Sequence, residues 1–529
     1  MKSVPTRKRT AVILAAAVMA GSASFAAAAE ITAWFAPSAL KIMRDARPVP
    51  AAPLRADMAA ARNESEACQL ALRADIAVRG VTVSVSDLVG PGGKGRLRPT
   101  LYKVEYVPIW EEKEPFPDPL PPLRGPLDLE AGRTQPVWIT VRVPAEAAPG
   151  DYQGVVTVAS ASGTKRLPLK LHVWDFALPV TPSSQTAFGL DYSGIAEFHD
   201  VEPGSARAAA LNKKYYEFLL DHRISPYNLP VDLGSDEAVP FLNDPRMTSY
   251  NIPIGTKSDA ELKSLVQRLI AGGWFAKGYF YEVDEPITKA AFDALVAVSA
   301  RIKAIEPRSR LVTPFWGNPD FDKTLRSKDV MLGRVGIWCP HLLYMESEPG
   351  FPRFLLDRRN AGDTIWWYNC GGLEKWDDER APYNNLDIPL SAMSCRVLLW
   401  QQRRFGLQGL LYWNTTYWHK KYTADPWVNT VMLEPRKCGD GMLLYPGKKV
   451  GIDGPVGSLR LEVLRDGLED FDYLALADQR LGPNVVSTYV ARIARTLTDY
   501  ERDPLKLEAV RRELGTALEK ATAEMRKTL

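Results

Sequence analysis

From residue 185 to residue 427 the sequence alternates between short apolar segments typical of strands and amphipathic segments typical of helices. Strand patterns occur at 186–192, 224–231, 250–254, 278–284, 310–316, 335–339, 364–369 and 409–413. Helical patterns lie between them, at 206–221, 259–271, 289–305 and 389–404. Eight strands that alternate with helices predict a parallel (β/α)8 barrel of the TIM type. The connection at 232–249 resembles a loop and is the weakest part of this pattern. An open doubly wound sheet is disfavoured, because no glycine-rich phosphate turn follows the first strand.

The segments before and after this alternation have a different character. Between residues 30 and 180, short β-type runs are separated by glycine and proline turns, a pattern that predicts a β-sandwich. Its clearest strands are expected at 80–85, 136–143, 152–158 and 165–173. After a short β-like stretch at 441–445, helical patterns follow at 458–480, 485–502 and 504–529. We therefore expect a multidomain α/β protein with a β-sandwich at 30–180, a barrel at 181–480 closed by the helix at 458–480, and a C-terminal helical extension at 481–529.

The first 29 residues have the three parts of an export signal. Arg7, Lys8 and Arg9 supply a basic start, an apolar run follows at 11–20, and an alanine-rich stretch precedes Glu30. The apolar run is shorter than the roughly 20 residues that a membrane-spanning helix needs. We expect cleavage near Glu30, a periplasmic or secreted mature protein, and no membrane span.

The composition argues against several classes of partner. The chain of 529 residues carries a formal net charge of +3 and has no basic tract, so we expect no nucleic-acid partner. The five cysteines lack the spacing of a zinc or redox site, and HExxH, GxSxG and P-loop motifs are absent, so we expect neither a metal nor a cofactor. Buried or free thiols with at most one or two bridges are expected at Cys68, Cys339, Cys370, Cys395 and Cys438.

Two adjacent carboxylates, Asp284 and Glu285, stand where the fourth predicted strand ends. In a (β/α)8 barrel the active site lies at the carboxyl ends of the strands. Pro286 disfavours helical geometry at Glu285, so we expect this residue to be extended at the rim. Crowding two acids raises the pKa of one and keeps a proton available for acid catalysis. An ordinary helix N-terminus is the alternative, and Glu282, on the same strand face as Asp284, is the second choice of carboxylate.

Aromatic residues gather in the same part of the chain. Of the 14 tryptophans, ten lie between Trp274 and Trp427, several of them at predicted strand ends. Indole faces stack on the apolar faces of sugars, and amide or hydroxyl groups bind the sugar hydroxyls. For any single tryptophan, a role in the core is as well supported as a role in sugar binding. For any single polar residue, a structural role is as well supported as substrate binding. The candidate substrate-binding residues are Trp316, Trp338, Trp366, Trp367, Tyr368, Asn369, Tyr412, Trp413 and Asn414. The long polar loop at 373–386, with Tyr383, Asn384 and Asn385, and Asp387 just beyond it, is a further candidate.

Five motifs occur in a fixed order along the chain. Asp284-Glu285-Pro286 is followed by Trp366-Trp-Tyr-x-Cys-Gly, Gly409-Leu-Leu-Tyr-Trp-Asn, Gly439-Asp-Gly-x-Leu-Leu-Tyr-Pro-Gly and Arg460-Leu-Glu-x-Leu-Arg-Asp-Gly-Leu-Glu-Asp-Phe-Asp-Tyr-Leu. With them the chain resembles glycoside hydrolase family 123 over about residues 179–481. The resemblance implies β-N-acetylgalactosaminidase activity in which the substrate's own acetamide oxygen attacks the anomeric carbon. It assigns the acid/base role to Glu285 and orientation of the acetamide to Asp284, with a glycan or glycoconjugate as partner.

Two alternatives remain open at this stage. Instead of a substrate-assisted hydrolase of this kind, the chain could be a glycosidase of different sugar specificity with a separate nucleophile, or a non-catalytic carbohydrate-binding protein. Two other charged groups are better explained as structural. Asp221-His222-Arg223 ends a predicted helix, and the cluster of Arg465, Asp466, Glu469 and Asp470 favours a solvated or ion-paired helix face over a catalytic one.

Overall fold

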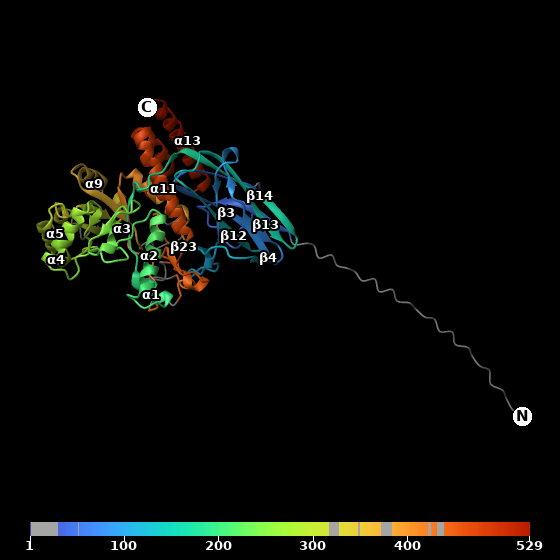
Figure 1. Cartoon of the computed structure of the whole chain (residues 1–529), viewed down its shortest axis with the longest axis horizontal. Coiled ribbons are helices and arrows are strands. Elements are labelled where there is room, and N and C mark those ends of the chain that lie inside the picture. Colours follow the sequence, from blue (N-terminus) through green and yellow to red (C-terminus); the bar gives the residue numbers. More distant parts are fainter. Residues whose placement is uncertain are drawn as a thin grey trace.

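The computed structural model describes Met1 and residues 30–50, 52–316, 327–347, 350–371, 383–421, 425–430 and 438–528. It is a multidomain α/β fold with a β-rich N-terminal region, a half-barrel parallel sheet and a helical C-terminus (Figure 1). The predicted export signal at 1–29 and most of the predicted loop at 373–386 lie outside the described residues.

The β-rich region, residues 31–177, contains two main sheets. Their facing sides share one apolar core, to which β12 contributes Val137, Ile139 and Val141. Trp138, on the opposite face of β12, packs into the core of the rest of the molecule, so this strand is buried on both faces. The first sheet has the order β1 (Ile31–Pro37), β3 (Glu64–Ala74), β12 (Thr134–Val143) and β7 (Thr100–Lys103). The second has the order β11 (Leu127–Leu129), β4 (Val78–Val85), β13 (Gly150–Ser160), β14 (Gly163–Ala177) and β2 (Ala56–Arg62).

Short strands complete this region and connect it to the C-terminal half. The pair β10–β23 is antiparallel and joins residues more than 300 positions apart, so the two halves share a small three-stranded sheet, β10-β23-β22. The short strands are β5 (Leu88–Val89), β6 (Arg96–Leu97), β8 (Tyr106–Val107), β9 (Phe116–Pro117), β10 (Pro119–Leu120), β22 (Leu444–Pro446) and β23 (Pro455–Ser458).

Five of the eight predicted barrel strands form one parallel sheet, in the order β15-β21-β20-β19-β18. The third and fourth predicted strands form a separate parallel pair, and the second is not a regular strand. The predicted eight-stranded barrel is therefore confirmed only as a half-barrel sheet. The parallel strands are β15 (Gln185–Phe188), β16 (Tyr250–Asn251), β17 (Gly278–Tyr279), β18 (Val312–Phe315), β19 (Ile337–Pro340), β20 (Thr364–Tyr368) and β21 (Gly409–Tyr412).

Single bridges and backbone hydrogen bonds connect the remaining segments to this sheet. Phe188 forms a parallel bridge with Pro226, and the Asn251 N–H donates to the Tyr227 carbonyl at 2.8 Å. On the other side, Phe280 forms a parallel bridge with Leu311. The segments at 224–228, β16 and β17 thus lie in chain order between β15 and β18. Because they carry few regular hydrogen bonds, they are much shorter as strands than the sequence predicts.

Helices lie on the outer side of these strands, and three of them have the bounds that the sequence predicts. Ser205, Ser258 and Thr288 each accept a hydrogen bond from a backbone N–H of the first turn, so each helix begins at a side-chain cap. Part of the predicted loop at 232–249 is helical, as α3. The helices of this half are α1 (Tyr192–His199), α2 (Ala206–Asp221), α3 (Val239–Leu242), α4 (Asp259–Ala271), α5 (Lys289–Ile305), α7 (Ser327–Met331), α8 (Tyr344–Ser347), α9 (Phe351–Asn360) and α10 (Met393–Arg404).

The C-terminal helices join the two halves of the molecule. In Figure 1, α11 (Leu459–Arg480) passes between the β-rich region and the parallel strands, and α13 (Pro504–Thr528) lies beside β14. At Gly467 a Cβ atom would lie 3.0 Å from the Arg396 carbonyl oxygen, so a glycine lets α11 cross α10 closely. The third helix, α12 (Pro483–Ile493), ends before residue 502, because a turn with a hydrogen bond from the Glu501 N–H to the Ile493 carbonyl follows it.

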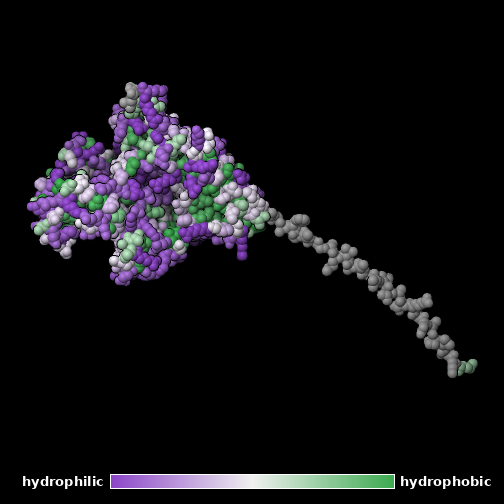
Figure 2. All heavy atoms as spheres, viewed as in Figure 1, coloured by the Kyte–Doolittle hydropathy of each residue, from purple (hydrophilic) through white to green (hydrophobic). Residues whose placement is uncertain are grey.

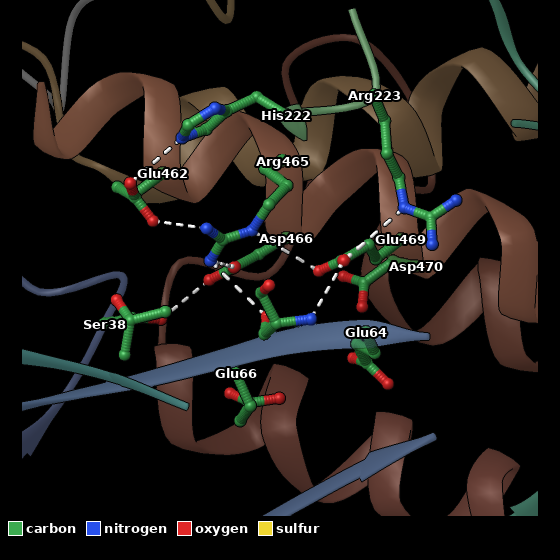
Figure 3. Close-up of polar contacts among 12 residues, drawn as sticks. Ser38, Glu64, Glu66, His222, Arg223, Glu462, Arg465, Asp466, Glu469 and Asp470 are labelled. Atoms are coloured by element: carbon green, nitrogen blue, oxygen red, sulfur yellow. Dashed lines mark hydrogen bonds and ion pairs between the residues drawn. The ribbon is translucent and has the colours of Figure 1, made fainter. Parts of the chain in front are cut away.

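Most side chains of α11 are buried, and its charged residues form an ionic network with both halves (Figure 3). The network supports the structural interpretation of both charged groups, although it is buried rather than solvated. His222 Nε2 lies 3.0 Å from Glu462, and Arg223 Nη1 donates to Asp472 at 2.8 Å. From the β-rich side, Ser38 Oγ donates to Asp466 at 2.9 Å.

The molecular surface has no extended apolar area on the face drawn in Figure 2, where hydrophobic residues are scattered among hydrophilic ones. No helix in the described part of the chain is long and apolar enough to cross a membrane.

Candidate active site

Asp284 and Glu285 lie just beyond β17, where the chain leaves the parallel strands. The Glu285 N–H donates to the carbonyl of Pro314, in β18, at 3.1 Å. Glu285 has a left-handed backbone at this contact, with a φ of 41°. The expectation that Glu285 is extended is therefore wrong, because the hydrogen bond to the neighbouring strand overrides the preference imposed by Pro286. Such a conformation costs about 1–3 kcal/mol and is typical of functional positions.

A tyrosine hydroxyl orients each of the two carboxylates. The Tyr281 hydroxyl donates to Asp284 Oδ1 at 2.8 Å, and the Tyr368 hydroxyl makes a short hydrogen bond to Glu285 Oε1. Tyr281 lies in the same segment after β17 as the two carboxylates. Tyr368 is the last residue of β20, which is separated from β18 by β19. Glu285 is therefore held between the fourth and seventh of the predicted strands.

The electrostatic surroundings differ from those of an ordinary surface acid. Asp284 keeps contact with solvent, yet the surrounding protein removes enough water for desolvation to raise the pKa of its carboxyl. The Tyr281 hydrogen bond opposes this effect and lowers the pKa. Burial and the nearby carboxylates also raise the pKa of the Tyr281 and Tyr368 hydroxyls, so both remain hydrogen-bond donors at neutral pH.

The His341 ring packs against the ring of Tyr368. His341 directly follows β19, and its ring lies 5.0 Å from the Tyr368 ring in an edge-to-face arrangement. Burial lowers the pKa of His341 to about 4, so the imidazole is neutral. His341 Nε2 lies 3.4 Å from the Cys370 carbonyl and must carry the proton, while Nδ1 accepts from the Leu343 N–H at 3.4 Å. A neutral imidazole of defined tautomer thus holds the end of β20.

Glu282, the second choice of carboxylate, has a different contact. Its Oε1 accepts the Ile254 N–H at 2.9 Å, just beyond β16. Nearby, Asn251 Oδ1 accepts the Tyr281 N–H at 3.1 Å. These two hydrogen bonds join the ends of the β16 and β17 segments, and they give Glu282 a role in holding the site together.

Three of the predicted substrate-facing tryptophans are completely buried. Trp338 and Trp367 lie in the core outside the sheet, where they donate to Asp363 at 2.9 Å and to Gln402 at 3.2 Å. Trp366 points to the inner side of the sheet, and its indole donates to Gln185 Oε1 at 2.8 Å, at the amino end of β15. It therefore lies at the end of the strands opposite to Glu285. None of these three candidate substrate-binding indoles is exposed in this structure.

Trp413 and Trp316 are the predicted tryptophans that keep exposed surface at the carboxyl ends of the strands. Trp316 follows β18 and is 46% exposed. Trp413 follows β21, is half-buried, and donates from Nε1 to Asp440 Oδ1 at 2.9 Å. Tyr412, the residue before it, is fully buried and donates to the same Asp440 oxygen at 3.0 Å.

The predicted polar residues divide into local and long-range roles. Asn414 Oδ1 accepts the N–H groups of Thr415 and Thr416, at 2.8 and 2.9 Å, and so forms the turn after β21. Asn369 is buried, and its amide nitrogen contacts the Asn384 carbonyl at 3.4 Å and Asn385 Oδ1 at 3.3 Å. These contacts bring the described end of the polar loop to the end of β20.

Sequence reasoning missed Tyr281, His341 and Asp440. Tyr281 had a detectable signal, since it lies three residues before Asp284 in an aromatic strand. Asp440 belongs to the Gly439-Asp-Gly motif, which was noted without a role. His341 gives no signal in the sequence, because its contact with Tyr368 depends on the pairing of β19 and β20. Among the described residues, no group of three or more His, Cys, Asp or Glu residues is placed to hold a metal ion. Cys68, Cys339 and Cys395 are buried thiols.

Comparison with known proteins finds two matching family models and a similar solved structure. The family model described as "Glycoside hydrolase 123, catalytic domain" matches residues 258–477, which include both carboxylates, and "Glycoside hydrolase 123 N-terminal domain" matches residues 46–160. The chain is similar to the solved structure of a family 123 glycoside hydrolase from Clostridium perfringens, described for glycolipid glycan hydrolysis. The TM-score is 0.67 at 15% identity, and the match covers 94% of this chain and 100% of that one.

A β-galacturonidase of family 2 from Eisenbergiella tayi is a more distant match. Its TM-score is 0.33 at 10% identity, with 77% of this chain and 69% of that one covered, which is too low to bear on the fold. No protein of curated function matches the sequence.

Proposed function

The chain belongs to glycoside hydrolase family 123, and on this premise we propose that it removes terminal β-linked N-acetylhexosamine residues from glycans. The sugar is of the N-acetylgalactosamine type, the anomeric configuration is retained, and the acetamide of the substrate serves as nucleophile. The observation that carries the proposal is the pair of adjacent carboxylates, each oriented by its own tyrosine.

Glu285 is the proposed acid and base. A carboxylic acid can accept a hydrogen bond on one oxygen and donate its proton from the other. The Tyr368 hydroxyl donates to Oε1 of Glu285 and so orients the carboxyl that gives its proton to the glycosidic oxygen. As that bond breaks, the acetamide oxygen of the substrate bonds to the anomeric carbon and forms a cyclic intermediate. Glu285, now ionised, then removes a proton from the water that opens this ring.

Asp284 is the proposed partner of the acetamide. Its carboxylate accepts the acetamide N–H and stabilises the positive charge that develops as the oxygen attacks. The Tyr281 hydroxyl occupies Oδ1 and thereby directs Oδ2 towards the substrate. A retaining enzyme with its own nucleophile needs carboxyl groups about 5–5.5 Å apart across the sugar, usually from different strands. Two neighbours on one strand end approach from one side, which favours assistance by the substrate.

We propose Trp316 and Trp413 as the indoles that contact the sugar, since both keep exposed surface at the strand ends.

Three further parts of the proposal concern the whole chain: a complete (β/α)8 barrel at 181–480, a supporting rather than catalytic role for the domain at 30–180, and export with cleavage near Glu30. N-terminal sequencing of protein from the periplasm or medium tests the last, and recovery of residues 1–29 from the cytoplasm would contradict it.

A substrate panel tests the activity itself. The purified chain should hydrolyse an aryl β-N-acetylgalactosaminide and leave the matching aryl β-galactoside intact, because only the former carries the nucleophile. A thiazoline analogue of the cyclic intermediate should inhibit, since it resembles the state that the site stabilises. Equal turnover of both glycosides, or a trapped covalent glycosyl-enzyme, would indicate a separate nucleophile. Glycan binding without turnover would indicate a non-catalytic protein.

A further inference from the structure

One buried arginine connects the candidate site to the β-rich region. Arg460 lies in the first turn of α11, and its side chain has no exposed surface. A guanidinium has five N–H donors, and each of the five is used here. Two donate to the carboxylate of Asp118, at 2.9 and 3.0 Å. The others donate to the backbone carbonyls of Leu386, Gly439 (2.8 Å) and Met442.

Asp118 is the anionic partner of this arginine and belongs to the β-rich region, between β9 and β10. It is fully buried, and its Oδ2 also accepts the Tyr445 hydroxyl at 2.6 Å. Its carbonyl accepts the Leu459 N–H at 2.6 Å, which attaches the start of α11 to the same residue. A buried guanidinium needs a charged partner because burial without one is costly. Asp118 therefore determines whether Arg460 stays in place.

Two of the carbonyls that Arg460 binds, those of Gly439 and Met442, are the first and last of the turn at 439–442. Asp440 lies in this turn. Asp440 is buried and accepts three hydrogen bonds from the site: from the Gly371 N–H after β20 at 3.0 Å, from the Tyr412 hydroxyl at 3.0 Å, and from Trp413 Nε1 at 2.9 Å. The turn also packs closely against the indole of Trp413. At Gly441, which has a φ of 71°, a Cβ atom would lie 2.2 Å from Trp413 Cζ2.

We propose that Asp118 is a positioning residue for the active site. It holds Arg460, Arg460 holds the turn at 439–442, and Asp440 in that turn sets the orientation of the Trp413 indole and the Gly371 turn. The β-rich region thereby contributes to substrate binding without contacting the substrate. This inference rests on the proposed function for its kinetic consequence, but the coupling between Asp118 and Trp413 exists without it.

The test compares Asp118→Asn with Glu462→Gln. Both variants remove a buried carboxylate that pairs with an arginine of α11, but Glu462 pairs with Arg465 and does not touch the turn. The environment of Trp413 is read from its indole N–H resonance in the 15N-labelled protein, which a Trp413→Phe variant assigns. KM and kcat are measured on the aryl β-N-acetylgalactosaminide.

Asp118→Asn should move the Trp413 indole resonance and lower kcat/KM by about tenfold to a hundredfold, the cost of a misplacement of about 1 Å in a site. Glu462→Gln should leave both unchanged. If Asp118→Asn does not fold, Asp118→Glu replaces it, because the negative charge is kept while the longer side chain displaces the carboxylate from Arg460. A folded Asp118→Asn with the wild-type resonance and kinetics overturns the inference, as does an equal effect of Glu462→Gln. Absence of turnover in the wild type would contradict the proposed function alone, since the resonance still tests the coupling.

Discussion

Carboxylates gather in two parts of this molecule, and their partners differ. In the network around α11, acids are buried and paired with guanidinium or imidazole groups, as Glu462 is with Arg465 and His222. At the end of β17, Asp284 and Glu285 accept hydrogen bonds from tyrosine hydroxyls. The positive charge of a guanidinium opposes protonation of its acid, whereas a phenol orients the acid without supplying a charge.

This difference distinguishes the structural acids from the proposed catalytic acids more clearly than burial or spacing does. Arg465 contacts Glu462 and lies 3.0 Å from Asp466, so both of these acids are paired with a guanidinium within the fold. Glu285 sits instead in a left-handed conformation at the end of a strand, where strain is tolerated for function. Variants in the two regions should therefore affect different measurements.

The largest effect is expected for Glu285→Gln. Loss of a general acid should lower kcat by about 10²–10⁴-fold on substrates with poor leaving groups and by much less on activated aryl glycosides. The free energy of unfolding should change little, because the amide keeps the shape of the side chain and its oxygen can still accept the Tyr368 hydroxyl. Glu282→Gln is the matched control and should keep most of the activity. Equal losses on both substrate types would remove Glu285 from the acid role.

Asp284→Asn should come next, with a loss of about 10²–10³-fold. In contrast to Glu285→Gln, the loss should be similar for good and poor leaving groups, because the acetamide must attack in both cases. Rates on two aryl glycosides with different leaving-group pKa values measure this pattern. Near-full activity of Asp284→Asn would exclude assistance by the substrate.

Local signals explain which elements could be predicted from the sequence. The bounds of α2, α4 and α5 were predictable, since Ser205, Ser258 and Thr288 mark their starts as capping residues. Strand lengths were not, because they depend on neighbours. The apolar run at 278–284 continues past Tyr279, where β17 ends, and its last residues turn to place the two acids.

Composition did not show which of the aromatic residues are exposed. The alternation along β20 sends Trp366 inward and Trp367 outward, and only the position along the strand shows that Trp366 faces the amino end. The contacts of Asp118 were beyond sequence reasoning for a different reason. It lies 342 positions from Arg460, and no local pattern indicates which buried acid meets which buried arginine.

The ion pairs of Glu462 with Arg465 and His222 should contribute to stability and not to catalysis. Burial raises the pKa of Glu462, but the attraction of Arg465 and His222 outweighs it and lowers the pKa from 4.5 to about 2. A lowered pKa stabilises the fold above the unfolded-state value, and this stability is lost as the pH falls from about 4.5 through about 2. At pH 7, Glu462→Gln should reduce the free energy of unfolding by about 3 kcal/mol. The stability of the Glu462→Gln variant should also depend less on pH between about 4.5 and about 2 than that of the wild type. Denaturant unfolding at several pH values measures this dependence. A drop in kcat without a loss of stability would contradict the distinction between the two regions.

The smallest effect is expected for Tyr281→Phe, which removes the hydrogen bond that orients the Asp284 carboxylate but leaves the carboxylate itself in place. The hydroxyl of Tyr281 lowers the pKa of Asp284 against the larger, raising effect of desolvation. Without it the pKa should rise further, so Asp284 would lose its charge at a higher pH. Because the acetamide needs the ionised carboxylate, the acidic limb of the kcat/KM profile should move to higher pH, with a loss of less than about tenfold at neutral pH. Tyr250→Phe, which removes a tyrosine hydrogen bond to the Trp274 carbonyl, is the matched control and should leave the limb in place. A limb that stays put or moves to lower pH in Tyr281→Phe would mean that the titration of Asp284 does not govern the reaction.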